Sequence, residues 1–432
     1  MPLKLRSFFT LTCLVLSVFT PGAVAQTGSV DADNWDVLRG ERNIFALKEA
    51  LQTDLPVSHG VHALGVAYVS AFSRDFKLAD QALNYARQYA AAREDAAFAR
   101  EVEEVTDILM REQGRFQALA FRLAHGPEAG LTWHRMVEYR ANTLTSSYIG
   151  SSEFTLKNIS PDKTRIVVPA QLGGVAGTLL FDTGADKNLL SERFATDYGA
   201  RRSEIRFNMS TADGTRSTEL AELNSVELGS ARFGGVLFGV QAKQDGVIGF
   251  FLNKGATGIL GFPLASRFGE ITFSVLDDRV EEVTLNRPTG VTPQSAGAPN
   301  MMIREDKPYI RVTLEDEVYA CIFDTGAPRS VFSNNIITRH KKGLKLKTLS
   351  RRVASREGLR GKYIQTVPLH AGHSDLALTN VQVVGAGGPA SDFCVIGLDA
   401  VIANGGARMN FETLQVQFGG SNAGRSQAFN LR

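Results

Sequence analysis

The sequence predicts a multidomain α plus β protein, in which an N-terminal all-α domain of helical hairpins precedes two tandem β-barrel lobes with a cleft between them. Three observations predict this arrangement. Residues from about 33 to 141 are rich in Ala, Leu, Glu and Arg, with apolar residues three or four positions apart, as in amphipathic helices. After about Ser147, short apolar runs alternate with Gly, Asp and Asn turns, which is typical of strands. Within this second part the pentapeptide Phe-Asp-Thr-Gly-Ala occurs twice.

Composition limits the classes of function. The chain has 432 residues, which is enough for about two to four domains. Hydrophobic residues make up 44% and charged residues 21%, so the chain can bury a normal core. Lys and Arg together number 47 against 45 Asp and Glu. The near balance of charges leaves no basic surplus of the kind that would indicate a nucleic-acid partner.

The N-terminus has the order of a secretory signal peptide. Lys4 and Arg6 precede an apolar run from Phe8 to Phe19, and Ala23-Val24-Ala25 offers a small-x-small cleavage site. We therefore predict that residues 1–25 are a signal peptide and that the protein is periplasmic or secreted. The run is short for a stable membrane span, and an uncleaved anchor is the alternative.

The region after the signal peptide divides into four parts. The helical domain is either a module that binds a protein partner or a domain that only packs against the rest. A stretch rich in Pro, Gly and Ser separates two β regions and reads as a linker. The predicted parts are the helical domain at 33–145, the first lobe at 150–285, the linker at 286–299 and the second lobe at 300–432.

The two β regions are copies of one unit. Each runs through a β-hairpin, the pentapeptide, a second hairpin, two aliphatic residues with a glycine, and a short helix with a last strand. Near-equal spacing supports a duplication, which predicts a pseudo-twofold molecule with a cleft between its halves. Gly214 and Gly261 follow Asp182 by 32 and 79 positions, and Gly358 and Gly397 follow Asp324 by 34 and 73.

The doubled pentapeptide predicts a pair of carboxyl groups. One Asp-Thr-Gly alone is most simply a capped turn. Two such turns facing each other bring Asp182 and Asp324 together, and close carboxylates share a proton. The ionised member is then a general base for water and the protonated member a general acid. This is amide hydrolysis that uses no cofactor and no metal, with Thr183 and Thr325 locking the turns across the lobes.

These motifs resemble those of the aspartic peptidases, and within them the retropepsin-like type. The matching pieces are the two Asp-Thr-Gly-Ala motifs together with Ile259-Leu260-Gly261 and Val395-Ile396-Gly397, over roughly residues 166–418. The resemblance implies retropepsin-like lobes and catalysis by the two aspartates. The active-site support that it implies comes from Thr183, Gly184, Ala185, Thr325, Gly326 and Ala327.

The resemblance also implies structural and substrate-covering roles. Hairpins at Asp213-Gly214 and at Gly358 become flaps that fold over a peptide, although ordinary surface hairpins are the alternative. Gly261 and Gly397 would lie under the two active-site turns. Asp186 would bond the substrate backbone in one half only.

Two departures from the family patterns carry predictions. Pepsin-like enzymes usually have Ser or Thr where this chain has Ala185 and Ala327, so a hydrogen bond to the ionised carboxylate is lost and activity should reach higher pH. Pro328 stands at the place of Asp186, which predicts an asymmetric cleft. Because both motifs lie in one chain, a monomer suffices.

Two cysteines follow the signal peptide, Cys321 and Cys394. Export permits a disulfide between them, and two buried free thiols are the alternative. The sequence as a whole predicts an exported aspartic endopeptidase that acts on polypeptides. A non-catalytic peptide-binding or scaffolding protein with peptidase-like lobes is the other hypothesis.

Overall fold

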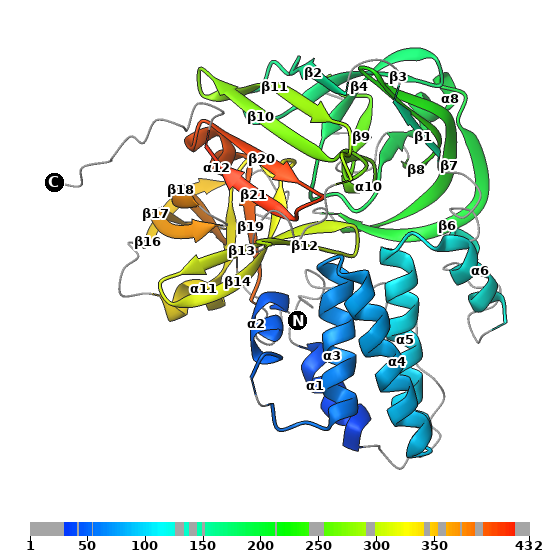
Figure 1. Ribbon diagram of the computed structural model, residues 1–432. Helices are drawn as coiled ribbons and strands as arrows, with labels where there is room; N and C mark the ends of the chain where they lie inside the picture. The colour runs from blue at the N-terminus through cyan, green and yellow to red at the C-terminus, as the bar shows by residue number, and fades with distance from the viewer. Residues whose placement is uncertain are drawn as a thin grey trace, which may run out of the picture.

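The computed structural model describes thirteen segments of the chain, and Figure 1 shows them as a group of N-terminal helices beside two β-rich lobes. The predicted signal peptide lies outside the described residues. Within the described segments no helix is long and apolar enough to cross a membrane. The segments are 30–40, 43–53, 55–125, 134–137, 145–148, 152–211, 214–241, 255–290, 299–340, 346–352, 360–371, 374–384 and 392–419.

The helical region is built by short, similar turns. Three-residue connections join α3 to α4, α4 to α5 and α5 to α6, so consecutive helices run as antiparallel neighbours. The middle residue of each connection is left-handed, at Arg74, Glu94 and Gly114. Asp75 then caps α4 and Asp95 caps α5 by accepting a backbone N–H bond. The helices are α1 (Val30–Gly40), α2 (Ile44–Ala50), α3 (His59–Phe72), α4 (Phe76–Ala92), α5 (Ala96–Glu112) and α6 (Phe116–Ala124).

The core of the helices extends into the second lobe. Trp35, Phe72 and Phe98 are fully buried between the helices, and Met302 of strand β12 (Met301–Arg304) belongs to the same apolar cluster. The Asn43 side-chain amide also donates to a backbone carbonyl of this lobe. The helical region is thus packed against the second lobe as well as continuous in sequence with the first.

The first lobe is an eight-stranded sheet that closes on itself. Its order is β1-β8-β5-β9-β4-β3-β7-β6, and β8 also pairs with β7. Two short helices, α8 (Glu192–Asp197) and α10 (Phe262–Ala265), cover it. The strands are β1 (Thr145–Tyr148), β3 (Val167–Leu172), β4 (Val175–Phe181), β5 (Leu189–Ser191), β6 (Arg201–Thr211), β7 (Gly214–Leu228), β8 (Ala231–Gln241) and β9 (Gly258–Leu260).

The second lobe repeats this pattern. Its order is β12-β13-β14-β19-β15-β18-β17-β16, with a further pairing of β13 and β17. Its helices are α11 (Asn334–Arg339) and α12 (Leu398–Ala403). The strands are β12 (Met301–Arg304), β13 (Lys307–Leu314), β14 (Glu317–Asp324), β15 (Val331–Ser333), β16 (Leu346–Arg352), β17 (Arg360–Ala371), β18 (Ser374–Val384) and β19 (Cys394–Gly397). The predicted fold class, a helical region followed by two β-barrel lobes, is confirmed.

A third sheet joins the lobes. Its order is β2-β11-β10-β20-β21, and the antiparallel pair β10–β20 connects the first lobe to the second. The single last strand expected in each lobe is wrong, because each lobe ends in a hairpin. Asp277 and Asp278 are both left-handed and turn β10 directly into β11. The strands are β2 (Glu153–Lys157), β10 (Glu270–Leu276), β11 (Arg279–Asn286), β20 (Gly406–Asn410) and β21 (Gln415–Phe418).

Candidate active site

The two pentapeptides lie in the same local fold. In the first lobe, Asp182 follows β4, which pairs in parallel with β9, while β5 pairs with β9 in the antiparallel sense. In the second lobe, Asp324 ends β14, and β19 pairs with β14 and β15 in the same two senses. Each aspartate therefore begins a turn that passes over a glycine at the end of the neighbouring parallel strand. This glycine is Gly261 after β9 in the first lobe and Gly397 at the end of β19 in the second.

A polar side chain in each turn fixes that glycine. The Asn188 side-chain oxygen accepts from the Gly261 N–H at 2.9 Å, and the Ser330 hydroxyl accepts from the Gly397 N–H at 3.0 Å. A Cβ on Gly261 would lie 2.4 Å from the carbonyl oxygen of Lys187, so a side chain does not fit there. Our sequence reasoning did not single out Asn188 and Ser330. Their equal six-residue distance from the two aspartates was the available signal.

The threonines bond across the lobes in both directions. The Thr183 N–H donates to the Thr325 hydroxyl at 3.1 Å, and the Thr325 N–H donates to the Thr183 hydroxyl at 3.0 Å. The Thr183 hydroxyl in turn donates to the Phe323 carbonyl at 2.7 Å, and the Thr325 hydroxyl to the Phe181 carbonyl at 2.8 Å. Both threonines are fully buried, so these four bonds hold the turns together without competition from water.

The same arrangement brings the two carboxyl groups together. A Cβ on Gly184 would lie 2.2 Å from the Asp324 carboxyl carbon, and one on Gly326 would lie 2.3 Å from that of Asp182. Each carboxyl thus packs against the opposite turn, where only glycine leaves room. One oxygen of each also accepts two backbone N–H bonds at 2.8–3.0 Å, from Gly184 and Ala185 in the first lobe and from Gly326 and Ala327 in the second.

The paired carboxyls hold protons more strongly than ordinary aspartates. Burial raises the pKa of Asp182, and the charge of Asp324 raises it further, to well above its usual value. Burial also raises the pKa of Asp324, although a hydrogen bond with Asp182 and the backbone N–H donors oppose the shift. The pair therefore keeps one proton over a range in which a free aspartate is ionised.

A lysine that sequence reasoning missed lies beside the pair. Lys307 begins β13 in the second lobe, and its positive charge lowers the pKa of Asp324 and of Asp186. Burial raises the pKa of Asp186, but Lys187 and Lys307 together outweigh it and hold the pKa below its usual value. In the second lobe the matching positions, Pro328 and Arg329, are exposed. The charged surroundings of the two turns therefore differ.

The strands of both proposed flap hairpins, β6–β7 and β16–β17, are described, but the tips at 212–213 and 353–359 lie outside the described residues. Gly214 pairs with Thr211 near the end of the β6–β7 hairpin. Asp213 and Gly358 lie outside the described residues, so the flap roles remain predictions. Among the described side chains, no group of three His, Cys, Asp or Glu forms a metal-binding cluster.

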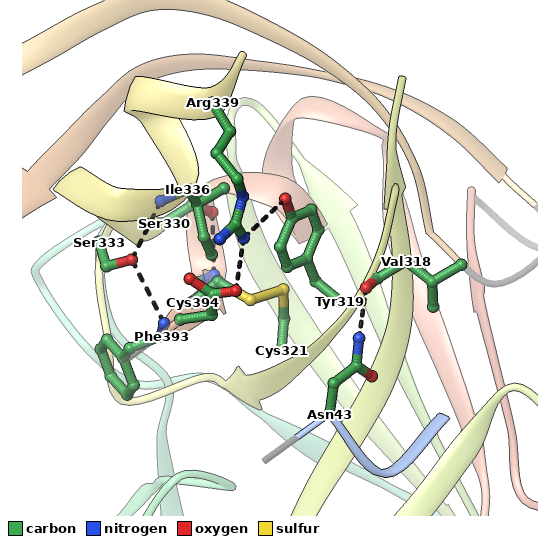
Figure 2. Close-up of a disulfide and its surroundings, with 12 residues drawn as sticks. Asn43, Val318, Tyr319, Cys321, Ser330, Ser333, Ile336, Arg339, Phe393 and Cys394 are labelled. Carbon is green, nitrogen blue, oxygen red and sulfur yellow. Dashed lines mark hydrogen bonds and ion pairs between the residues drawn. A yellow bond between two sulfur atoms is a disulfide. The ribbon is translucent and has the colours of Figure 1, made fainter. Parts of the chain in front are cut away.

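The structure joins Cys321 and Cys394 in a disulfide, which Figure 2 shows close to the start of α11. The bridge links β14 to β19, three residues before Asp324 and three before Gly397. Ser333 lies beside it and accepts N–H bonds from Ile336 and Phe393. The disulfide therefore ties together the two strands that carry the second active-site turn.

Comparison with known proteins bears on the first lobe. Residues 168–264, within the first lobe, match the family model described as aspartyl protease, so the predicted resemblance to the aspartic peptidases is confirmed over this range. Among solved structures, the chain is similar to a retropepsin-like aspartic protease from Rickettsia conorii. The two are 19% identical, with a TM-score of 0.23, over 33% of this chain and 93% of that one. Among curated proteins no relative matches the chain.

The cross-lobe lock gives a first prediction. Thr325→Val removes the hydroxyl that accepts from Thr183 and donates to Phe181, leaving two buried backbone groups unpaired. We expect a loss of about 1–3 kcal/mol in the free energy of unfolding, seen as a lower melting temperature. Thr325→Ser keeps the hydroxyl and is the matched control. Equal melting temperatures for the Val and Ser variants would show that the lock contributes nothing.

The raised pKa of Asp182 gives a second prediction. Because the folded protein holds this proton more tightly, the stabilising contribution of the group is fully present below about pH 4 and is lost as pH rises through the raised pKa. Asp182→Asn cannot ionise, so its melting temperature should rise relative to wild type from about pH 4 upward.

Asp186→Asn is the control on the same turn. The pKa of Asp186 is lowered, so its contribution to stability is present above its ordinary pKa and is lost as pH falls. The melting temperature of Asp186→Asn relative to wild type should therefore fall as pH rises, opposite to that of Asp182→Asn. A difference between Asp182→Asn and wild type that does not change with pH would contradict the raised pKa.

Proposed function

We propose that the protein is an exported aspartic endopeptidase that hydrolyses peptide bonds with water activated by Asp182 and Asp324. The observation that carries this proposal is the meeting of two carboxyl groups, both with raised pKa, in turns locked by reciprocal threonine bonds. The aspartyl-protease match over the first lobe supports the same reaction class.

The proposed chemistry needs one proton on the pair. The ionised carboxyl takes a proton from a bound water, whose oxygen attacks the peptide carbonyl carbon. The protonated carboxyl donates its proton to the carbonyl oxygen, which gives a tetrahedral diol. The carboxyl that is now ionised then takes back a proton from a hydroxyl of the diol. The other carboxyl gives its proton to the nitrogen, and the C–N bond breaks. The backbone N–H donors orient each carboxyl before the substrate arrives, which lowers the cost of reorganisation.

The disulfide supports the export part of the proposal. Disulfides persist in oxidising compartments and are rare where thiols are kept reduced. The signal-peptide pattern at residues 1–25 points to the same compartment. Both halves of the site come from one chain, so we propose a monomer as the active unit, with the helical region available to a protein partner.

Catalysis by the pair gives a third prediction. Asp182→Asn and Asp324→Asn should each abolish cleavage of a mixed peptide pool, since neither variant can supply both a base and an acid. The lost cleavage should be the part that pepstatin inhibits in wild type. The pH–rate profile should extend to higher pH than that of pepsin-like enzymes, because both pKa values are raised.

Asp197→Asn, at an exposed position of the first lobe, is the matched control and should retain wild-type rates. Full activity in either active-site variant would contradict the shared-proton mechanism. A wild-type protein that binds peptides without cutting them would favour the peptide-binding hypothesis instead.

Export gives a fourth prediction. When the full chain is expressed in a bacterium, mass spectrometry of the exported protein should find Gln26 as its first residue. Labelling of the denatured protein should find no free thiol, because Cys321 and Cys394 are bridged. Cys321→Ala leaves one thiol and calibrates the labelling. An uncleaved chain in the membrane fraction, or two free thiols, would contradict the proposal.

A further inference from the structure

A cavity of about 130 Å³ lies where the three parts of the molecule meet. Its wall comes from the helical region, from the first lobe and from the turn between β12 and β13 in the second lobe. A cavity shared by all three parts is absent from a molecule that consists of the two lobes alone. The helical region therefore shapes space next to the candidate active site in addition to packing on the second lobe.

The walls of the cavity are largely apolar. Phe116 of α6 and Met136 of the short helical segment 134–137 face it from the helical region, and Leu220, Val236 and Phe238 face it from the first lobe. An apolar cavity of about 150 Å³ accommodates a benzene molecule, so the space suits a side chain such as Leu or Phe.

The cavity lies against the turn that begins at Asp182. Asp186 and Lys187 line it, and they belong to the turn that starts at Asp182. Lys307 lines it from the second lobe, and its charge acts on Asp324. The two aspartates themselves do not line it. A peptide bound over the pair would therefore reach the cavity with a residue away from the scissile bond.

The charged groups around the cavity balance one another. Lys187 lies 3.4 Å from Asp186, and Arg111 pairs with Glu112 at 2.9 Å. Acidic and basic groups are equal in number on the wall, so the wall offers no net charge to select a charged occupant. The basic groups are Arg111, Lys187 and Lys307, and the acidic groups are Asp186, Glu305 and Asp306.

We propose that this cavity is an outer specificity subsite that takes an apolar side chain of the polypeptide substrate. The inference rests on the proposed peptidase function and adds to it, because it makes the helical region part of substrate selection. The ligand is a large aliphatic or aromatic side chain of an extended peptide, at a position that does not flank the bond being cut.

The test compares cleavage of peptide pairs that differ at one outer position, with Leu or Phe in one member and Ala in the other. In wild type one outer position should favour the large side chain by about tenfold or more in kcat/KM. Met136→Trp fills the cavity and should abolish this preference, by lowering kcat/KM for the large-side-chain member to that for the Ala member. Phe116→Ala enlarges the cavity and should shift the preference toward the largest side chains.

Phe121→Ala is the matched control, because Phe121 lies on the same helix as Phe116 but is 71% exposed. It should keep the wild-type preference, and melting temperatures verify that all variants are folded. Identical preferences in wild type, Met136→Trp and Phe116→Ala would overturn the proposed subsite.

The two proposals fail separately. If wild type cuts no peptide, the proposed peptidase function is wrong, and the subsite is then tested by fluorescence anisotropy with the same peptide pairs. Tighter binding of the large-side-chain member to wild type, lost in Met136→Trp, would support the subsite. Equal affinities for both members would overturn it.

Discussion

The reciprocal bonds between Thr183 and Thr325 are the constraint on which the rest of the molecule depends. Each threonine hydroxyl accepts one N–H bond from the opposite lobe and donates one bond to a carbonyl there, with no exposure to water. Without the opposite turn, the buried threonine hydroxyls and backbone groups of each turn would have no hydrogen-bond partners. The bonds between the turns therefore also fix the positions of the two carboxyl groups relative to each other. The antiparallel pairing of β10 with β20 in the third sheet also holds the two lobes in a fixed position relative to each other.

The two halves match where each turn holds its glycine, and they differ in the charged groups around the turns. Asn188 and Ser330 differ in chemistry but perform the same task, since each holds the glycine below its turn. Two positions earlier the halves diverge, because Asp186 lies among lysines whereas Pro328 is exposed. The helical region adds to the difference between the two halves. It shares an apolar core with the second lobe, whereas with the first lobe it encloses a cavity.

The sequence predicted the features that depend on short local motifs and on their repetition in the two lobes. The order of elements around each Asp-Thr-Gly-Ala, and the pairing of Asp182 with Asp324, follow from duplication plus strand and turn patterns. Lys307 could not be predicted, because its place beside Asp324 depends on how β13 crosses the sheet and not on a motif. The cavity depends on packing between parts distant in sequence. The terminal hairpin was missed because Asp277-Asp278 was not recognised as a two-residue turn.

The central claim is that the two turns make one site that shares one proton. Carbon-13 NMR of the aspartate carboxyl carbons, assigned by comparison with Asp182→Asn and Asp324→Asn, measures this directly across a pH titration. We predict two coupled steps, with the second well above the ordinary aspartate pKa of about 3.9. Removal of one aspartate should eliminate the coupling. Two independent titrations near the ordinary value would contradict the claim.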